Sequence, residues 1–575
     1  MILKALKEYY DRRTDLAPVG WIEKEIDYEI VLKHDGTFLQ LNLLKENNDG
    51  KPCIVPAIGK QAMKHTNSGI DANLFWDNTA FVLGIGNKGE KKRASFIETI
   101  KVWLGNVKDD GITAVLCFLE SGIKNPDIFI PIIKHSEFGE EICSGRPNIT
   151  IRLQNESGFI FERPIIKNTI SEKWPLLSEN IGTSICLVTG QKENIEPCHT
   201  VIKGVRGSQT WGATIVGFND KAFCSFQKEQ GANSPVGKVT AFAYTTALNH
   251  LLSKDSSQKM LVGDATTVFW AAKETGFEKE LLDFFGEPPK DDPDRGIRAV
   301  ESLFNSVKNG AFSIDDNNNK FYVLGLAPNA SRISIRFWIA DTVARMAEKI
   351  VQYFEDIKIV HGAKGNSFLS LFRFLVSIAS QEKSDNIPPN LAGETMRSIL
   401  EGIPYPETLL QAAVRRNRAE QNVSYPRASL IKACINRKTR FYNQNIKEEL
   451  KMSLDPTNTN IGYRLGRLFA TLEKIQEEAS PNINATIRDR FYGAASGTPV
   501  SVFGNLMRLK NHHLSKLENV GRKINFEKLI GEILNDGVDG VTGFPATLSM
   551  ADQGRFAIGY YHQAQDFYTK KENKD

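Results

Sequence analysis

The stretch "SRISIRFWIADTVARMAEKIVQYFEDI", residues 331–357, contains the change of pattern that decides the fold. Its first part alternates as a strand does, because Arg332 and Arg336 share one face and the apolar residues between them share the other. The part after Thr342 has the composition of a helix, and we expect no strand beyond it. The sequence therefore predicts an α+β protein, with an irregular mixed α/β N-terminal body followed by a C-terminal helical bundle.

Short apolar runs divided by turn residues fill the sequence before this stretch. The segment "YEIVLKHDGTFLQLNLL", 28–44, has Asp35 and Gly36 between two strand-like halves, which is typical of a β-hairpin. The β-branched and aromatic runs "ITAVLCFLES", 112–121, and "SICLVTGQ", 184–191, predict further strands. We expect helices such as "AFAYTTALNHLLS", 241–253, to interrupt these strands.

These patterns predict three regions: a mixed α/β domain over 1–340, a helical basic connecting region over 341–451 and a C-terminal helical bundle over 452–575. The last boundary lies at "MSLDPTNTN", 452–460, which has turn composition. Apolar residues spaced four and three apart then predict the first bundle helix; they are Ile461, Leu465, Leu468, Leu472 and Ile475. Further helices are expected near 484–492, 500–518, 524–535 and 545–569.

Bulk composition is ordinary for an intracellular protein. The net charge of +4 over 575 residues means that nucleic-acid binding would have to come from local basic patches. Seven scattered cysteines without a Cys-x-x-Cys pair indicate a reducing compartment. The sequence contains no apolar run long enough for a membrane span, and its start "MILKALKEYYDRR" becomes charged too early for a signal peptide. We expect a cytoplasmic protein without membrane contact.

Motifs for catalysis are absent from the sequence. It has no His-Glu-x-x-His, no zinc-like Cys and His quartet, no phosphate loop ending in Lys-Ser/Thr and no Gly-x-Ser-x-Gly elbow. Cys198 and His199 are neighbours but have no second pair of ligands. We therefore expect no catalytic residue, no metal site and no cofactor.

The segment "FVLGIGNKGEKKR", 81–93, leaves one enzymatic alternative open. Gly84, Gly86 and Gly89 have the spacing of a dinucleotide-binding loop, which would make the protein a nucleotide-dependent enzyme such as an oxidoreductase or nuclease. That interpretation requires a strand before the loop, for which "TAFVLGI" is a candidate, and tight packing at the third glycine. The charged residues Glu90 to Arg93 oppose such packing, and the cations fit a solvated loop or a phosphate contact better.

Basic residues cluster more consistently than catalytic ones; the imbalance at 415–440 favours phosphate contact over a solvated surface, whereas a solvated surface explains the bundle cluster equally well. Between 415 and 440, eight cations stand against one acid, Glu420; they are Arg415, Arg416, Arg418, Arg427, Lys432, Arg437, Lys438 and Arg440. In the bundle, a basic face is predicted from Arg464, Arg467, Arg508, His512 and Lys516. The glycine-rich segment 201–218 adds Lys203, Arg206 and Gln209 around Trp211, which is either a stacking side chain or a buried one.

Several stretches together resemble one known family. They include "NSGIDANLFWDNTAFVLGI" at 67–85, "KGVRGSQTWGATIVGFNDKAFCSFQKEQGANSPV" at 203–236, "RLGRLFATLEKIQEEA" at 464–479 and "NATIRDRFYGAASGTPVSVFGNLMRLKNHHLSKL" at 484–517. In order along the whole chain, these stretches resemble the large subunit of the type I-C CRISPR Cascade surveillance complex.

This resemblance implies a non-enzymatic subunit of an RNA-guided complex. Such a subunit recognises the protospacer-adjacent motif, helps to open the duplex and stabilises the R-loop. The implied partners are CRISPR RNA, double-stranded target DNA and its displaced single strand, the backbone, handle-binding and small bundle subunits of Cascade, and a helicase-nuclease. The family also makes the bundle separately from an internal start codon, for which Met452 is the candidate.

The resemblance also suggests where DNA contacts lie. Motif recognition is expected at Asn73, whose carboxamide can donate to and accept from a base edge, together with Lys64, Asn67 and Ser68. Phosphate contacts are expected from the loop that follows, at Asn87, Lys88, Lys91, Lys92 and Arg93.

Overall fold

The computed structural model describes residues 2–46, 49–59, 70–135, 137–176, 182–218, 220–286, 290–292, 294–308, 318–362, 369–388, 390–534 and 543–568. Lys64, Asn67 and Ser68 lie outside these residues. The chain divides into two compact units: unit 1 comprises Met1–Lys254 and Pro328–Ile333, and unit 2 comprises Asp255–Ala327 and Ser334–Asp575. The boundaries predicted after residues 340 and 451 do not coincide with this division, so the three-region organisation stays a prediction.

Unit 1 is a mixed α/β body, as the sequence predicts. Its strands are β1 Trp21–Ile26, β2 Tyr28–Leu32, β3 Phe38–Leu43, β4 Lys51–Pro56, β5 Trp76–Asn78, β6 Asn148–Leu153, β7 Thr183–Ile185 and β8 Lys192–Asn194. Its α-helices are α1 Ile2–Arg12, α3 Thr79–Val82, α4 Gly89–Leu104, α5 Asp110–Lys124, α6 Ile130–Ile133, α7 Gly139–Cys143, α8 Pro164–Lys173 and α9 Lys238–Leu251.

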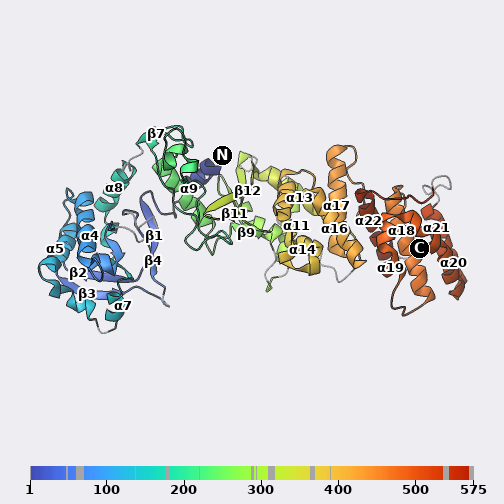
Figure 1. Ribbon diagram of the computed structural model, residues 1–575, viewed down its shortest axis with the longest axis horizontal. Helices are drawn as coiled ribbons and strands as arrows, with labels where there is room; N and C mark the ends of the chain where they lie inside the picture. The colour runs from blue at the N-terminus through green and yellow to red at the C-terminus, as the bar shows by residue number, and fades with distance from the viewer. Residues whose placement is uncertain are drawn as a thin grey trace. The chain divides into compact units, whose positions relative to one another are not determined.

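A four-stranded sheet in the order β3-β2-β6-β5 forms the centre of this unit. Strands β2 and β3 pair antiparallel across the turn that contains Gly36 at φ +86°, which confirms the predicted hairpin. Strand β6 pairs parallel to β2, and β5 pairs antiparallel to β6. Apolar residues of this sheet pack with those of α4 and α5, which Figure 1 shows in blue, into the core of unit 1.

The strand predicted at "ITAVLCFLES" is wrong, because this segment lies in helix α5. Asp109 caps the helix, since its side chain accepts a hydrogen bond from the backbone N–H of Ile112 at 3.1 Å. Phe118 is buried against Phe129, at 5.3 Å between ring centroids. Capping and one-sided burial therefore outweigh the β propensity of Ile112 and its neighbours.

Unit 2 contains a second four-stranded sheet, in the order β12-β11-β10-β9, followed by helices. Its strands are β9 Lys259–Val262, β10 Ala265–Ala271, β11 Lys320–Asn329 and β12 Arg332–Thr342. Helices α10 Phe277–Phe285 and α11 Arg295–Lys308 lie between β10 and β11 in the chain. The hairpin tip, Pro328–Ile333, belongs to unit 1. Ile333 and Phe337 on the predicted apolar face of β12 are buried, whereas Ile335 is exposed.

After Thr342, every described element is helical, as the sequence predicts. These helices are α13 Val343–Ile357, α14 Leu371–Ile378, α15 Leu391–Glu401, α16 Glu407–Glu420, α17 Tyr425–Tyr442, α18 Ile461–Ala479, α19 Ile487–Gly497, α20 Phe503–Lys516, α21 Val520–Leu534 and α22 Met550–Tyr568. One continuous apolar core extends from the sheet through α17 to α22. Four residues of the predicted stripe on α18, Leu465, Leu468, Leu472 and Ile475, are buried in it.

Helices α18 and α22 pack with their backbones in contact at two glycines. A Cβ atom on Gly466 would lie 2.0 Å from the carbonyl oxygen of Phe556, and one on Gly559 would lie 2.0 Å from that of Tyr463. Only glycine permits this approach. The pair therefore forms the centre of the bundle, with α19, α20 and α21 packed around α18.

Candidate nucleic-acid interface

The glycine pattern of 84–89 builds a tight turn in front of helix α4. Gly84 and Gly86 have φ values of +72° and +77°, and Lys88 also adopts the left-handed conformation. A Cβ on Gly89 would lie 2.0 Å from the carbonyl oxygen of Gly84, so the turn requires glycine there. The loop therefore folds back onto the first turn of the helix.

The dinucleotide interpretation of this loop lacks its preceding strand. Residues Thr79–Val82, in the segment considered as that strand, form the short helix α3. The strand before it, β5, ends at Asn78, and Asn78 is the residue that precedes α3. A dinucleotide loop runs directly from a strand into a helix, so the spacing of Gly84, Gly86 and Gly89 does not support that site.

Asn87, Lys88 and Lys91 are exposed around the N-terminus of α4. Neither lysine forms an ion pair with any described residue, and Glu90 is the acidic residue in the first turn. No side chain caps this 16-residue helix at its N-terminus, and the helix dipole favours an anion at this end. Two lysines beside them add positive charge, so this end of α4 can hold a phosphate group.

The two following cations do not share this exposure. Lys92 lies over the ring of Phe81, with 5.4 Å from Nζ to the ring centroid. Arg93 is only 9% exposed, lies 5.4 Å over the ring of Phe129 and donates to the carbonyl oxygen of Leu83 at 3.4 Å. Burial lowers the pKa of Arg93. The expected phosphate contact by Arg93 is therefore wrong for this conformation, because its guanidinium faces the core.

Helix α4 also fixes the segment that holds Asn73. The backbone N–H of Ala72 donates to Ser95 Oγ at 3.1 Å, and Thr99 Oγ1 donates to the carbonyl oxygen of Ala72 at 3.3 Å. The backbone N–H of Asn73 donates to Asp77 Oδ2 at 2.9 Å. The Asn73 side chain is 3% exposed, so the structure does not present it at the surface for a base contact.

The Asp77 side chain is buried in contact with this segment. Burial raises its pKa from 3.8 to about 7, although the backbone N–H groups of Asn73 and Asn78 and the charge of Lys92 act in the opposite direction. The carboxyl group therefore changes protonation near neutral pH while it holds the backbone of Asn73.

A second basic surface in unit 1 combines cations with exposed aromatic rings. Lys203, Arg206 and Gln209 are exposed, and Trp211 is 57% exposed, which decides the open alternative in favour of a surface tryptophan. Arg332 lies 3.9 Å over the ring of Phe223. Phe226, three residues after Phe223 in the chain, is 93% exposed. Phe223 and Phe226 were not among the residues predicted from sequence; their signal is two phenylalanines in the otherwise polar segment "NDKAFCSFQKEQ".

Many of the cations predicted around α16 and α17 are paired with acids, on the same helix or on other helices of unit 2. Arg416 pairs with Glu420, Lys438 with Glu407, and Arg440 with Asp356 at 2.8 Å. Arg437 is buried and donates to Tyr405 Oη at 2.9 Å, and Arg418 donates to Gln553 at 3.4 Å. On β12, Arg336 pairs with Asp264 at 2.8 Å. Among the predicted cations of these helices, Arg415 and Arg418 are exposed and have no described ion pair.

The residues predicted to form a basic face on the bundle differ in their exposure. Arg464 and Arg467 are 3% and 2% exposed, and they donate to the carbonyl oxygen of Asn458 and to Gln563 Oε1 at 3.0 and 3.1 Å. Their predicted place on an exposed face is wrong, because α18 is surrounded by other helices. Arg508, His512 and Lys516 are exposed on α20, where their spacing of four puts them on one side of the helix.

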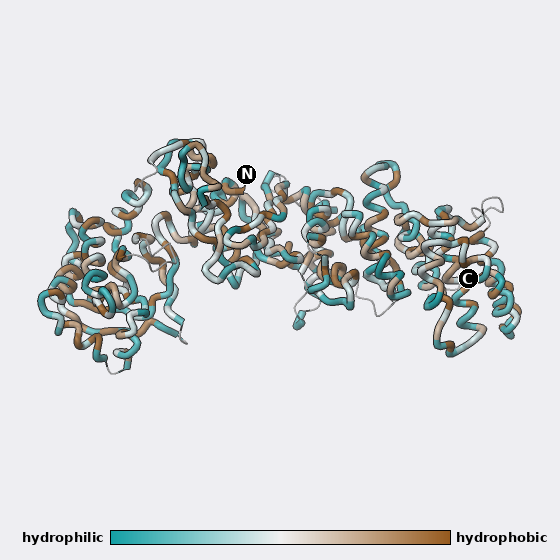
Figure 2. The backbone as a smooth tube through the Cα atoms, in the orientation of Figure 1, coloured by the Kyte–Doolittle hydropathy of each residue, from teal (hydrophilic) through white to brown (hydrophobic). Residues whose placement is uncertain are grey.

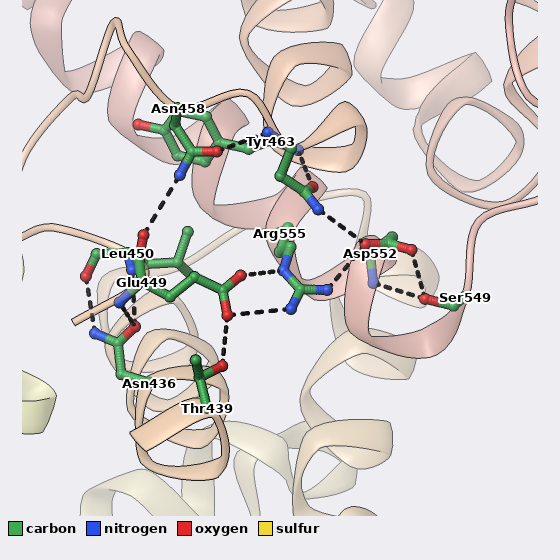
Figure 3. A network of polar contacts seen from close by, with 10 residues as sticks. Asn436, Thr439, Glu449, Leu450, Asn458, Tyr463, Ser549, Asp552 and Arg555 are labelled. Atoms are coloured by element: carbon green, nitrogen blue, oxygen red, sulfur yellow. Dashed lines mark hydrogen bonds and ion pairs between the residues drawn. The ribbon is translucent and has the colours of Figure 1, made fainter. Parts of the chain in front are cut away.

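Met452 lies exposed in the connection between α17 and α18, and a polar network fixes this connection (Figure 3). Arg555 of α22 donates to both carboxylate oxygens of Glu449 and, at 2.9 Å, to Asp552. The Asn436 side chain on α17 binds the backbone N–H and carbonyl of Leu450, each at 2.8 Å. The turn composition of 452–460 therefore does not mark a loose linker in this structure.

The described residues contain no cluster of three or more His, Cys, Asp or Glu side chains that could hold a metal ion. Figure 2 shows hydrophilic and hydrophobic residues mixed along the helices, and none of the helices in the described ranges is apolar over the length that a bilayer requires.

Comparison with protein families gives one match that extends over residues 6–568, to the family described as CRISPR-associated protein (Cas_Csd1). Comparison with curated proteins found no match. Because the family match covers nearly the whole chain, from α1 to the end of α22, this chain belongs to the Cas_Csd1 family of CRISPR-associated proteins.

Proposed function

We propose that this chain is the non-catalytic large subunit of a type I-C Cascade complex. In this role it recognises the protospacer-adjacent motif, aids duplex opening, stabilises the R-loop and supports recruitment of a helicase-nuclease in antiviral defence, while CRISPR RNA reads the target sequence. Its partners are CRISPR RNA, target DNA and the other Cascade subunits in the cytoplasm. Membership of a CRISPR-associated family supports this proposal.

The N-terminus of α4 is the observation that carries the DNA contact. It combines a helix N-terminus without a side-chain cap, a glycine turn and two exposed lysines without a described ion pair, Lys88 and Lys91. Duplex backbone is a row of phosphates, and helix N-termini with lysines are suited to such anions. Asn87, Lys88 and Lys91 contact phosphate in this role, and the buried segment that holds Asn73 is hydrogen-bonded to helix α4.

The surface around Trp211 is proposed to hold the displaced strand. Bases of single-stranded DNA stack on exposed aromatic rings while cations follow the backbone. Trp211, Phe223 and Phe226 provide rings, and Lys203 and Arg206 provide charge on the same segment of chain.

The test is duplex binding by the reconstituted complex, with Lys88→Ala/Lys91→Ala compared with Lys33→Ala/Lys108→Ala, which removes two exposed lysines elsewhere in unit 1. Each phosphate contact contributes about 0.9 to the slope of log K against log salt. We expect the first variant to bind motif-bearing duplex more weakly, with the slope reduced by about 2. Equal affinities and equal slopes for the two double variants would contradict the assignment of these lysines.

A further inference from the structure

A cavity of about 440 Å³ lies in unit 1, away from the glycine loop. Strands β1 and β4 line it on one side and helix α9 on the other, with the loops around residues 15–17 and 200–203 at its edges. Its volume falls in the range of small-molecule sites, roughly 300–1,000 Å³. None of its lining residues belongs to 83–93, so the cavity is separate from the proposed phosphate contact on α4.

Two lysines line this cavity without a carboxylate partner. Lys24 on β1 is half-buried and Lys203 is exposed, and neither side chain has an ion pair or hydrogen bond to any residue that the structure describes. Burial lowers the pKa of Lys24, and the positive charge of Lys203 lowers it further. Two like charges that share a cavity favour an anion between them, because an anion relieves both their repulsion and the desolvation of Lys24.

The other titratable groups of the cavity offset this positive charge only in part. Asp15 is engaged by Arg13, whose Nε donates to it at 2.7 Å, and the Arg13 hydrogen bond lowers the pKa of Asp15. His250 lies 3.4 Å from Arg13, and burial followed by the Arg13 charge lowers its pKa, so the imidazole is neutral at pH 7. Glu23 is the remaining carboxylate of the lining, and it is exposed.

The rest of the lining is amphipathic. Trp21 and Phe242 contribute buried aromatic rings, and Thr200, Thr246 and Asn249 contribute polar groups. A purely aliphatic tail could form no hydrogen bond with the Thr200 and Thr246 side chains, and covering them without one costs free energy. An anion with an aromatic, hydrogen-bonding body would satisfy both parts of the lining.

The lysine side of the cavity is preformed. Asn249 on α9 accepts a hydrogen bond from the backbone N–H of Lys203 at 2.8 Å and donates to the carbonyl oxygen of Val201 at 3.1 Å. These two bonds fix the loop that carries Lys203 on the helix. Binding therefore does not require that loop to fold first, which reduces the entropic cost.

We propose that this cavity binds a nucleotide, with the phosphate between Lys24 and Lys203 and the base beside Trp21 and Phe242. The ligand is either a free mononucleotide or one nucleotide of a single strand, because both present the same phosphate and base. The inference does not rest on the proposed function. It shares Lys203 with the surface proposed for the displaced strand, whereas Lys24 belongs to the cavity alone, so dependence of binding on Lys24 separates the two proposals.

Calorimetry on the full-length chain tests the proposal with AMP, UMP, inorganic phosphate and a six-nucleotide single strand as probes. Lys24→Met and Lys203→Met remove one charge each while they keep an apolar stem, and Lys33→Met is the matched control on the β2–β3 turn. We expect at least tenfold weaker binding for each of the first two variants and less than a twofold change for the control.

The probes separate the two sources of the ligand. Binding of AMP or UMP that depends on Lys24 indicates a free nucleotide, whereas binding of the strand alone, with the same dependence, indicates a nucleotide within a strand. Inorganic phosphate that binds as tightly as every nucleotide probe would overturn the role of the aromatic rings. Binding unaffected by both lysine variants, or no binding of any probe, would overturn the proposal.

A second measurement covers the case that a variant fails to fold. The wild-type chain is treated with an amine-reactive acylating reagent, and modification of Lys24 and Lys203 is measured by mass spectrometry with and without the probe that binds. We expect at least threefold protection of both lysines and none of Lys33; equal protection of all three, or of none, would overturn the proposal. Duplex binding by the Lys88→Ala/Lys91→Ala variant is independent of this result, so the two proposals fail separately.

Discussion

Asp77→Asn should change how the stability of unit 1 depends on pH. The Asp77 carboxyl is buried and holds the backbone N–H of Asn73, and burial raises its pKa from 3.8 to about 7. The folded chain therefore keeps a proton on this group at pH values where the unfolded chain has lost it. The contribution of Asp77 to the free energy of unfolding is therefore largest below pH 3.8. It decreases as the pH rises from 3.8 to about 7 and does not change further above about pH 7. Asparagine does not titrate and removes this dependence.

The magnitude follows from the two pKa values. Each tenfold difference in proton binding corresponds to about 1.4 kcal/mol, so the full effect is about 4 kcal/mol. Between pH 5 and pH 8 the wild type should lose about 3 kcal/mol relative to the variant. Asparagine keeps one acceptor oxygen where the carboxylate has two, so we expect a pH-independent loss of about 1 kcal/mol from one hydrogen bond in addition.

Urea unfolding of the full-length chain at pH 5 and pH 8 measures this effect through tryptophan fluorescence, because Trp76 is buried next to Asp77. At each pH, the free energy of unfolding of the variant is subtracted from that of the wild type. The change of this difference between pH 5 and pH 8 is the result of interest, because titratable groups common to both proteins cancel. A difference that stays constant within about 1 kcal/mol would refute the reasoning, because it would mean that Asp77 ionises in the fold as it does in the unfolded chain.

Three further changes probe the other features. Trp211→Ala should weaken binding of single-stranded DNA by about 1–3 kcal/mol, since one stacked base is lost, while Trp211→Phe keeps most of it; filter binding measures both, and equal affinity for the alanine variant would contradict stacking. Gly89→Ala should cost about 1–3 kcal/mol in urea unfolding, because its Cβ would meet the carbonyl oxygen of Gly84, whereas Gly504→Ala, with open space at that position, should cost almost nothing. Glu449→Gln should destabilise unit 2 by about 1–3 kcal/mol, because Arg555 loses one of its two charged partners and keeps only Asp552, and the exposed Glu394→Gln serves as the control; an equal effect of both would contradict the role of the network in Figure 3.

Patterns within one element predicted this fold well. The hairpin at Gly36, the end of the strands at Thr342 and the stripe of α18 each depend on residues close together in sequence. The sequence predicts a strand where helix α5 lies, because Ile112 and Val115 favour strands locally. In the structure, the cap by Asp109 and the packing of Phe118 on Phe129 stabilise the helix instead. Here the tertiary environment outweighs a weak local preference.

The charge clusters show why sites are harder to predict than elements. The segment 415–440 is strongly basic in sequence. However, Lys438 forms an ion pair with Glu407 and Arg440 forms one with Asp356, and both acids are far away along the chain. Arg464 and Arg467 lie beside the apolar stripe of α18 in sequence, yet four other helices pack around α18 and bury them. A local count of charges cannot identify such partners, so it overestimates the basic surface.

What remains after these pairings is a smaller set of exposed cations. Lys88 and Lys91 lie at a helix N-terminus, Lys203 and Arg206 lie beside exposed rings, and Arg508 and Lys516 lie along one side of α20. Because the net charge of the chain is only +4, the field of the whole protein adds little, and attraction for nucleic acid has to come from these local sites. Salt should therefore weaken binding through a few identifiable contacts, and the α4 pair should account for the larger share, because the helix dipole adds to its charge.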